Sequence, residues 1–219
     1  MNIIPPENLL SAYAQGIFPM ADSRDSDDVE WYSARMRGII PVDQFHVSKN
    51  LARLIRQGKF EVKIDTRFRE VVTACADRES TWINDLIINS YDILNQSGYA
   101  HSVEVYKEGK LVGGLYGVHL QAAFFGESMF KLENEADKVA LYYCHQILKK
   151  NGFRLWDTQF YTDHLSQFGC IEIDAEDYEL LLERAMQKKC DFDLWTGFYS
   201  DSNIKKGCLL SGKQPFNFS

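Results

Sequence analysis

Three apolar segments with strand character follow one another without a helix between them, and this run constrains the fold more than any other feature. They cover residues 102–106, 111–120 and 122–130, and they are separated by Glu108-Gly109 and by a short turn near Gln121. Each segment is rich in β-branched and aromatic residues, and connections this short join antiparallel neighbours. The sequence therefore predicts a three-stranded meander within one central sheet.

Helical patterns lie on both sides of the predicted meander. Helices are predicted at residues 7–13, 49–57, 66–75 and 82–95 before it, and at 134–150, 161–168 and 176–189 after it. Short strands are predicted at 29–32, 60–64 and 154–158. This order of elements predicts an α/β (α+β) fold, in which helices flank one mixed sheet.

Composition places the chain among ordinary folded proteins. It has 219 residues, enough for one large domain or for a core domain with a small module, and 45% of them are hydrophobic. The first thirty residues contain no basic segment followed by an apolar run, so we expect a cytoplasmic protein without a membrane anchor. The cysteines are odd in number and widely spaced, which predicts free thiols. They are Cys75, Cys144, Cys170, Cys190 and Cys208.

A basic stripe stands out against the net charge of −7. Lys49, Arg53 and Arg56 are spaced by four and three residues on a predicted helix, so their side chains project from one face. One interpretation is a solvated helix face, and the other is contact with phosphate groups.

Polar residues interrupt apolar strands at two places. Glu127 lies between Gly126 and Ser128 in the third strand of the meander, where an unpaired carboxylate is costly to bury. Asp157 and Gln159 are two residues apart at a strand end and are expected to share one face. An outward-facing edge strand and a helix cap are the structural interpretations, and a site for proton transfer is the functional one.

Several other chemistries lack their motifs. The chain has no GxSxG elbow around Ser128 and no glycine-rich nucleotide-binding fingerprint. Its histidines lack HExxH or paired ligand spacing, so we expect no metal site. They are His46, His101, His119, His145 and His164.

The order of short motifs along the chain resembles that of the leucyl/phenylalanyl-tRNA–protein transferases. The resemblance covers residue 8 to about residue 185, and the GGLYG and FGESMF blocks are its most specific parts. The matching segments are residues 12–19, 31–33, 46–49, 75–76, 81–83, 100–104, 111–117, 125–130 and 157–159.

The resemblance implies a fold of two parts. A small N-terminal α/β domain, residues 1–62, is expected to precede an N-acetyltransferase-like catalytic domain, residues 63–219. The RxxGxG loop that binds acetyl-CoA is absent from the sequence, which favours a tRNA donor.

The resemblance also implies a reaction and its catalytic residues. Leu or Phe would move from aminoacyl-tRNA to the α-amine of a protein that begins with Arg or Lys, which marks that protein for N-degron proteolysis. Glu127 would fix the aminoacyl end, while Asp157 would orient and polarise the amide of Gln159 to assist attack by the amine. The ester is already activated, so no cofactor is expected, and we expect the enzyme to act as a monomer.

The remaining site residues also follow from the resemblance. Trp82 would stack on the terminal adenosine, and the stripe of Lys49, Arg53 and Arg56 would bind tRNA. Met20 and Cys144 stand where the family usually has aromatic residues near that adenosine, and Trp156 replaces a smaller aliphatic residue, which puts donor selectivity among Leu, Phe and Met in question. The lining of the side-chain pocket would be Leu115, Phe124, Leu141, Leu148 and Trp156.

Two alternatives remain at the level of sequence. One is a related aminoacyl-tRNA–protein transferase with a different donor or acceptor. The other is a catalytically silent tRNA-binding module, against which the presence of Glu127, Asp157 and Gln159 argues.

Overall fold

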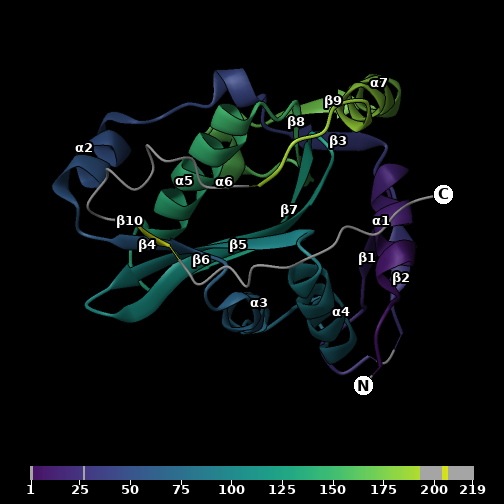
Figure 1. Ribbon diagram of the computed structural model, residues 1–219, viewed down its shortest axis with the longest axis horizontal. Coiled ribbons are helices and arrows are strands. Elements are labelled where there is room, and N and C mark those ends of the chain that lie inside the picture. The colour runs from purple at the N-terminus through teal and green to yellow at the C-terminus, as the bar shows by residue number, and fades with distance from the viewer. Residues whose placement is uncertain (1, 27, 193–203, 207–219) are drawn as a thin grey trace.

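A mixed sheet of eight strands organises the part of the chain that the computed structural model describes, residues 2–26, 28–192 and 204–206 (Figure 1). Its strands lie in the order β10-β4-β5-β6-β7-β8-β3-β9. They are β3 (Met36–Ile39), β4 (Glu61–Ile64), β5 (Ala100–Lys107), β6 (Lys110–Leu120), β7 (Ala123–Lys131), β8 (Leu155–Gln159), β9 (Ile171–Asp174) and β10 (Ile204–Lys206). A separate antiparallel pair contains β1 (Phe18–Met20) and β2 (Glu30–Tyr32).

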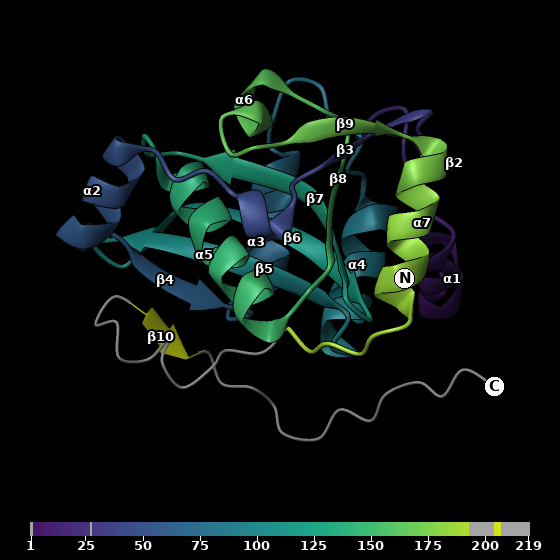
Figure 2. The same cartoon turned by 90° about the horizontal axis from the view of Figure 1, so that it is seen from above.

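Helices cover both faces of this sheet, and for this reason β5 is buried along almost its whole length. The long helix α5 (Ala136–Asn151) lies on one face, while α3 (Phe68–Ala76) and α4 (Asp85–Gln96) lie on the other (Figures 1 and 2). The other helices are α1 (Pro6–Ala14), the short 3-10 helix η1 (Val42–Gln44), α2 (Lys49–Gln57), α6 (Asp163–Ser166) and α7 (Ala175–Met186). The predicted α/β architecture of one mixed sheet with flanking helices is confirmed.

The predicted meander is also confirmed. Strands β5, β6 and β7 pair antiparallel in sequence order. Glu108 and Gln121 occupy the two connecting turns with φ of 52° and 54°, in the left-handed region that tight turns require.

Local capping explains where several helices begin. Ser48 accepts a hydrogen bond from the Leu51 amide at the start of α2, as the sequence predicts. Helix α4 begins later than predicted because Asn84 caps it, which leaves Trp82 in the preceding loop. Helix α6 is shorter than predicted because Thr162 is its N-cap.

The sequence analysis missed strands β1, β3, β9 and β10. Strand β3 carries an arginine and a glycine and shows no alternation of polar and apolar residues. It pairs with β8 on one side and with β9 on the other. Gly38 allows β3 to lie close to the residues that follow β8, because a Cβ there would overlap the backbone carbonyl group of Phe160.

The expected domain boundary between residues 62 and 63 falls inside β4. Strand β3, also from the expected small domain, lies in the same sheet as the meander. The division itself stays a prediction, but the central sheet runs across it.

Strands β7 and β8 separate at the point where each contains an extra residue. Their parallel pairing extends from Ala123 opposite Leu155 to Phe125 opposite Asp157. Beyond it, Glu127 is the unpaired residue of a β-bulge against β6, since Gly126 pairs with Gly117 and Ser128 with Tyr116. Bulges of this kind change the direction of a side chain and are common beside active sites.

Within the described ranges, no helix is long and apolar enough to cross a membrane. The four cysteines described there, Cys75, Cys144, Cys170 and Cys190, are free and buried, as expected. Cys208 lies outside the described residues.

Candidate active site

A cavity of about 330 Å³ borders β7 and β8 where the two strands separate. Apolar side chains form most of its wall, and Glu127 and Gln159 supply polar groups. The lining is Phe18, Met20, Arg78, Trp82, Leu115, Tyr116, Phe124, Gly126, Glu127, Ser128, Met129, Leu141, Trp156, Thr158, Gln159, Phe160, Thr162, His164 and Leu165.

The bulge directs Glu127 toward three hydrogen-bond donors. Its Oε1 accepts from the Tyr13 hydroxyl at 2.8 Å and from the Gln159 amide Nε2 at 3.2 Å. Its Oε2 accepts from the Tyr91 hydroxyl at 3.2 Å, and the oxygen atoms of the two tyrosine hydroxyls lie in contact with each other. Burial raises the pKa of Glu127 to about 7, although the hydrogen bonds from the tyrosines act in the opposite direction.

Asp157 is fully buried beneath the site, where several donors bind its carboxylate. Arg37 binds its carboxylate from β3 through Nε at 3.0 and 3.1 Å and through Nη2 at 2.7 Å. Tyr178 of α7 donates to the same carboxylate at 2.6 Å. The remaining guanidinium nitrogen of Arg37, Nη1, donates to the carbonyl oxygen of Gly16 at 2.9 Å.

The Arg37 guanidinium also lies between two aromatic rings. Its central carbon is 4.8 Å from the ring centroid of Phe18 and 4.5 Å from that of Tyr178. Cation–π contact of this kind stabilises a desolvated arginine. The ion pair with Asp157 raises the pKa of Arg37 despite its burial.

Gln159 connects the two carboxylates. Its backbone amide donates to Asp157 Oδ1 at 2.7 Å, and its φ of 57° is left-handed. Its side-chain Nε2 donates to Glu127, which leaves the amide oxygen to accept a hydrogen bond. The sequence analysis expected Asp157 to orient the side-chain amide of Gln159, and this expectation is corrected. Asp157 binds the backbone N–H of Gln159, whereas Glu127 orients its side-chain amide.

The strand argument for these residues also needs correction. An extra residue, Thr158, lies between the positions of β8 that pair with Ile39 and Gly38. Simple alternation therefore does not relate Asp157 to Gln159. The first side chain contacts Arg37 and the second contacts Glu127.

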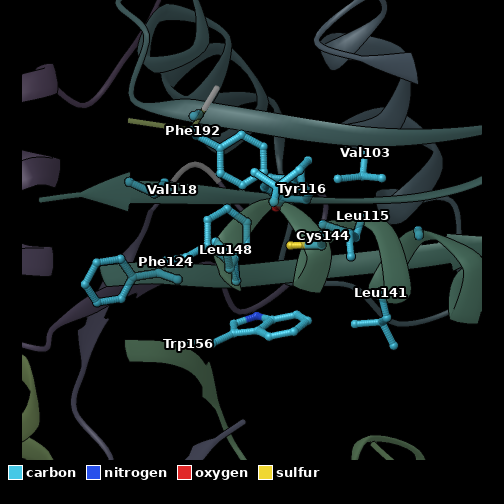
Figure 3. Packing of buried hydrophobic residues seen from close by; sticks show 14 of the residues in the cluster. Val103, Leu115, Tyr116, Val118, Phe124, Leu141, Cys144, Leu148, Trp156 and Phe192 are labelled. Atoms are coloured by element: carbon cyan, nitrogen blue, oxygen red, sulfur yellow. The ribbon is translucent and has the colours of Figure 1, made fainter. Parts of the chain in front are cut away.

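Most of the expected pocket residues border the cavity, but two do not. Leu115, Phe124, Leu141, Trp156, Trp82 and Met20 all line it. Cys144 and Leu148 are fully buried on α5, in a cluster with Trp156 and Phe192 (Figure 3). They support the wall from behind, and Cys144 offers no surface to an adenosine.

The sequence analysis missed the four residues that hold the carboxylates, Arg37, Tyr178, Tyr13 and Tyr91. Each comes from a different element, so no local spacing connects them to Glu127 or Asp157. The available signal was the acidic residue itself, because a carboxylate at a buried strand position requires a cation or several donors.

The basic stripe lies apart from the cavity lining. Lys49, Arg53 and Arg56 are exposed on α2, as their spacing predicts, and no ion pair to any of them is found within the described part of the chain. In the same described ranges, no three His, Cys, Asp or Glu side chains gather closely enough to hold a metal ion.

Comparison with protein families identifies the chain. The family described as leucyl/phenylalanyl-tRNA protein transferase matches residues 39–183, and the N-terminal domain of the same transferase matches residues 3–35. The chain belongs to this family.

Two curated relatives carry the same name, leucyl/phenylalanyl-tRNA–protein transferase. The protein from Rhizorhabdus wittichii is 51% identical over 190 residues, which cover 85% of this chain and 77% of that protein. The protein from Ruegeria pomeroyi is 49% identical over 189 residues, which cover 86% and 90%.

Solved structures show more distant likenesses. FemX has a TM-score of 0.47 and 14% identity over 89% of this chain and 70% of its own. L-PGS from Bacillus licheniformis has a TM-score of 0.46 and 9% identity over 84% and 71%. At these scores the likeness adds no weight to the assignment.

Replacing Arg37 by Met is expected to destabilise the fold strongly. Asp157 would become a buried carboxylate without its cation, and breaking such a pair costs about 3–5 kcal/mol. Urea denaturation measures the change in the free energy of unfolding. The control is Arg67→Met, which removes an exposed ion pair with Glu70 and should cost less than about 1 kcal/mol. Equal losses in the two variants would contradict the importance of the buried pair.

Glu127 is expected to make stability depend on pH. The folded protein keeps a proton on Glu127 up to about pH 7, whereas the unfolded chain loses it near 4.5. The stability contributed by this group is therefore complete below the lower value and falls as the pH rises toward the higher one, by up to about 3 kcal/mol. Subtracting the urea denaturation data of Glu127→Gln, which cannot ionise, isolates this contribution. A difference between the two proteins that is constant with pH would rule out the raised pKa.

Proposed function

We propose that the cavity holds the aminoacylated 3′ end of a tRNA and transfers its Leu or Phe to the N-terminal α-amine of a protein beginning with Arg or Lys. The observation that carries this proposal is the Gln159 amide, fixed by Glu127 at the edge of an apolar cavity. The chain belongs to a family whose curated relatives are named as leucyl/phenylalanyl-tRNA–protein transferases, and this supports aminoacyl transfer from tRNA as the reaction.

The apolar wall suits the side chain of the donor. Leu115, Leu141 and Trp156 present hydrocarbon surface, which favours an apolar side chain in proportion to the area that it buries. Such a wall distinguishes a single methylene by only about 1–3 kcal/mol. Leu, Phe and Met therefore all remain candidate donors, and the bulk of Trp156 sets the available length.

Two lining residues suit the terminal nucleotide. Trp82 supplies an aromatic face for stacking on the adenine, a contact worth about 1–3 kcal/mol. Arg78 borders the same cavity and donates to the Ser128 hydroxyl at 2.6 Å, so its positive charge lies within reach of a phosphate. Lys49, Arg53 and Arg56 on α2 would contact the phosphates of the tRNA body.

The chemistry is aminolysis of an ester. The acceptor amine forms a bond to the ester carbonyl carbon, and the bond from that carbon to the ribose oxygen breaks. Gln159 accepts a hydrogen bond from the amine through its amide oxygen and aligns the nitrogen lone pair with the carbonyl. Most of the acceleration comes from this positioning, because it replaces a bimolecular encounter by a fixed geometry.

The proposed enzyme acts as a monomer. We place the reaction in the cytoplasm, where charged tRNA and new protein N-termini meet.

The purified protein is expected to move labelled Leu or Phe from charged tRNA to peptides that begin with Arg or Lys. Peptides with each N-terminal residue, and tRNAs charged with Leu, Phe or Met, define both specificities in one assay. A peptide with an acetylated N-terminus is the control, because it has no amine. If no combination gives transfer while the protein still binds tRNA, the chain is a silent tRNA-binding module.

Gln159→Ala is expected to slow transfer by about 10²–10⁴-fold, because the amine loses the group that aligns it. Binding of tRNA should change little, since Gln159 contacts only the reacting end. Single-turnover rates and filter binding separate the two effects. The matched control is Gln96→Ala, which changes an exposed glutamine at the end of α4. Parallel loss of transfer and tRNA binding would assign Gln159 a structural role.

A further inference from the structure

A second ionisable pair borders the cavity, and the proposed reaction leaves it without a role. His164 of α6 lines the cavity, and its Nε2 lies 3.4 Å from Oδ2 of Asp137 in the first turn of α5. Asp137 is only 5% exposed, although its side chain is polar. Leu141, one helical turn after Asp137 in α5, also lines the cavity.

The pair is incompletely satisfied. Oδ1 of Asp137 is buried without a hydrogen-bond partner among the described residues, and Nε2 of His164 is also buried without a well-formed hydrogen bond. Lys131 of β7 approaches the same carboxylate, with its Nζ 3.4 Å from Oδ2. A pair that only stabilised the fold would be expected to satisfy these atoms, because leaving a buried acceptor unpaired costs about 1–3 kcal/mol or more.

The position of Asp137 favours one tautomer of His164. A carboxylate only accepts, so the ring protonated at Nε2 suits the 3.4 Å contact with Oδ2. In the neutral ring Nδ1 then has the lone pair. The His164 side chain is 34% exposed, so its ring is accessible to a group in the cavity and to water.

Aminolysis needs a base before it needs an aligned amine. Near neutral pH most N-terminal amines are protonated, since their ordinary pKa is about 7.7–8.0. The ammonium nitrogen has no lone pair with which to attack. Gln159 is an amide and accepts a hydrogen bond, but it does not take a full proton.

We propose that His164, held by Asp137, is a catalytic base that takes the first proton from the acceptor's α-ammonium group. This inference rests on the proposed function. The proton moves from nitrogen to Nδ1, and the exposed imidazolium releases it to solvent. The neutral amine then forms the bond to the carbonyl carbon while the bond to the ribose oxygen breaks. The second proton lost by the nitrogen balances the one that the ribose oxygen gains.

The surroundings of His164 allow this cycle. The charged groups recorded near its ring are Asp137 from α5 and, through that carboxylate, Lys131 from β7. Asp163 precedes it on α6 and is exposed. The aromatic ring of Phe168 packs against it at 5.7 Å. The 34% exposure of the side chain gives a proton on the ring a path to solvent.

The test compares two acceptors at two pH values. One peptide carries an ordinary N-terminal α-amine, and the other carries an α-aminooxy group, which is already neutral near pH 7. His164→Gln should slow single-turnover transfer to the ordinary peptide by about 10²-fold or more near pH 7. The defect should shrink toward pH 9, where the amine is neutral without help. Transfer to the aminooxy peptide should change by less than about threefold.

Two further variants complete the design. Asp137→Asn should give a smaller defect with the same dependence on pH and acceptor, because an amide at this position orients the ring without the charge of the carboxylate. His46→Gln, which alters an exposed histidine in the loop before α2, should match wild type. Thermal melting shows whether each variant is folded. If His164→Gln does not fold, the comparison is made with Asp137→Asn instead.

The possible results separate this inference from the proposed function. Absence of transfer by the wild-type protein would overturn the proposed function itself. Normal transfer by wild type and by His164→Gln would overturn the role of His164 alone. A defect of equal size at both pH values and with both acceptors would also overturn it, because a structural or substrate-binding role predicts that pattern.

Discussion

The buried ion pair between Arg37 and Asp157 is the interaction on which the site depends. The arginine comes from β3 and the aspartate from β8, and the same two side chains also bind the Gly16 carbonyl and the Tyr178 hydroxyl. Four segments that are distant in sequence therefore meet at one contact. Such a pair adds little net stability compared with an apolar replacement, but its loss leaves a charge unpaired. Its main effect is to fix one arrangement of β8, and with it the backbone of Gln159.

A second constraint acts on the other side of the cavity. Glu127 receives hydrogen bonds from Tyr13 of α1 and Tyr91 of α4, so the N-terminal helix helps to hold a residue of the central sheet. The two carboxylates have different environments. Asp157 has a cation beside it, whereas Glu127 has only neutral donors in hydrogen-bonding contact. Burial raises the pKa of Glu127 to about 7, although the hydrogen bonds from the tyrosines lower it. Gln159 is hydrogen-bonded to both carboxylates, to Asp157 through its backbone and to Glu127 through its side chain, so the positions of the two are linked.

Local sequence patterns predicted the parts of this molecule that local forces determine. The meander, the cap of α2 by Ser48 and the basic face of that helix depend on residues within a few positions of one another. Strand β3 and the role of Arg37 were missed because the partner, Asp157, lies 120 positions away. The resemblance to the family identified Glu127, Asp157 and Gln159, but not the hydrogen bonds between them. It also included Cys144 and Leu148, because adjacency to a pocket and contact with it cannot be distinguished without coordinates.

The bulge at Glu127 makes the number of residues in β7 as important as their identity. In a regular strand, side chains an even number of positions apart lie on one face, and the extra residue reverses this relation for every position beyond it. Because Gly126 and Ser128 already pair with neighbouring residues of β6, loss of the extra residue would give a regular ladder and leave residues 128–131 opposite the same partners. What would disappear is the carboxylate that meets Tyr13, Tyr91 and Gln159. The site therefore depends on one more residue in β7 than the ladder itself requires.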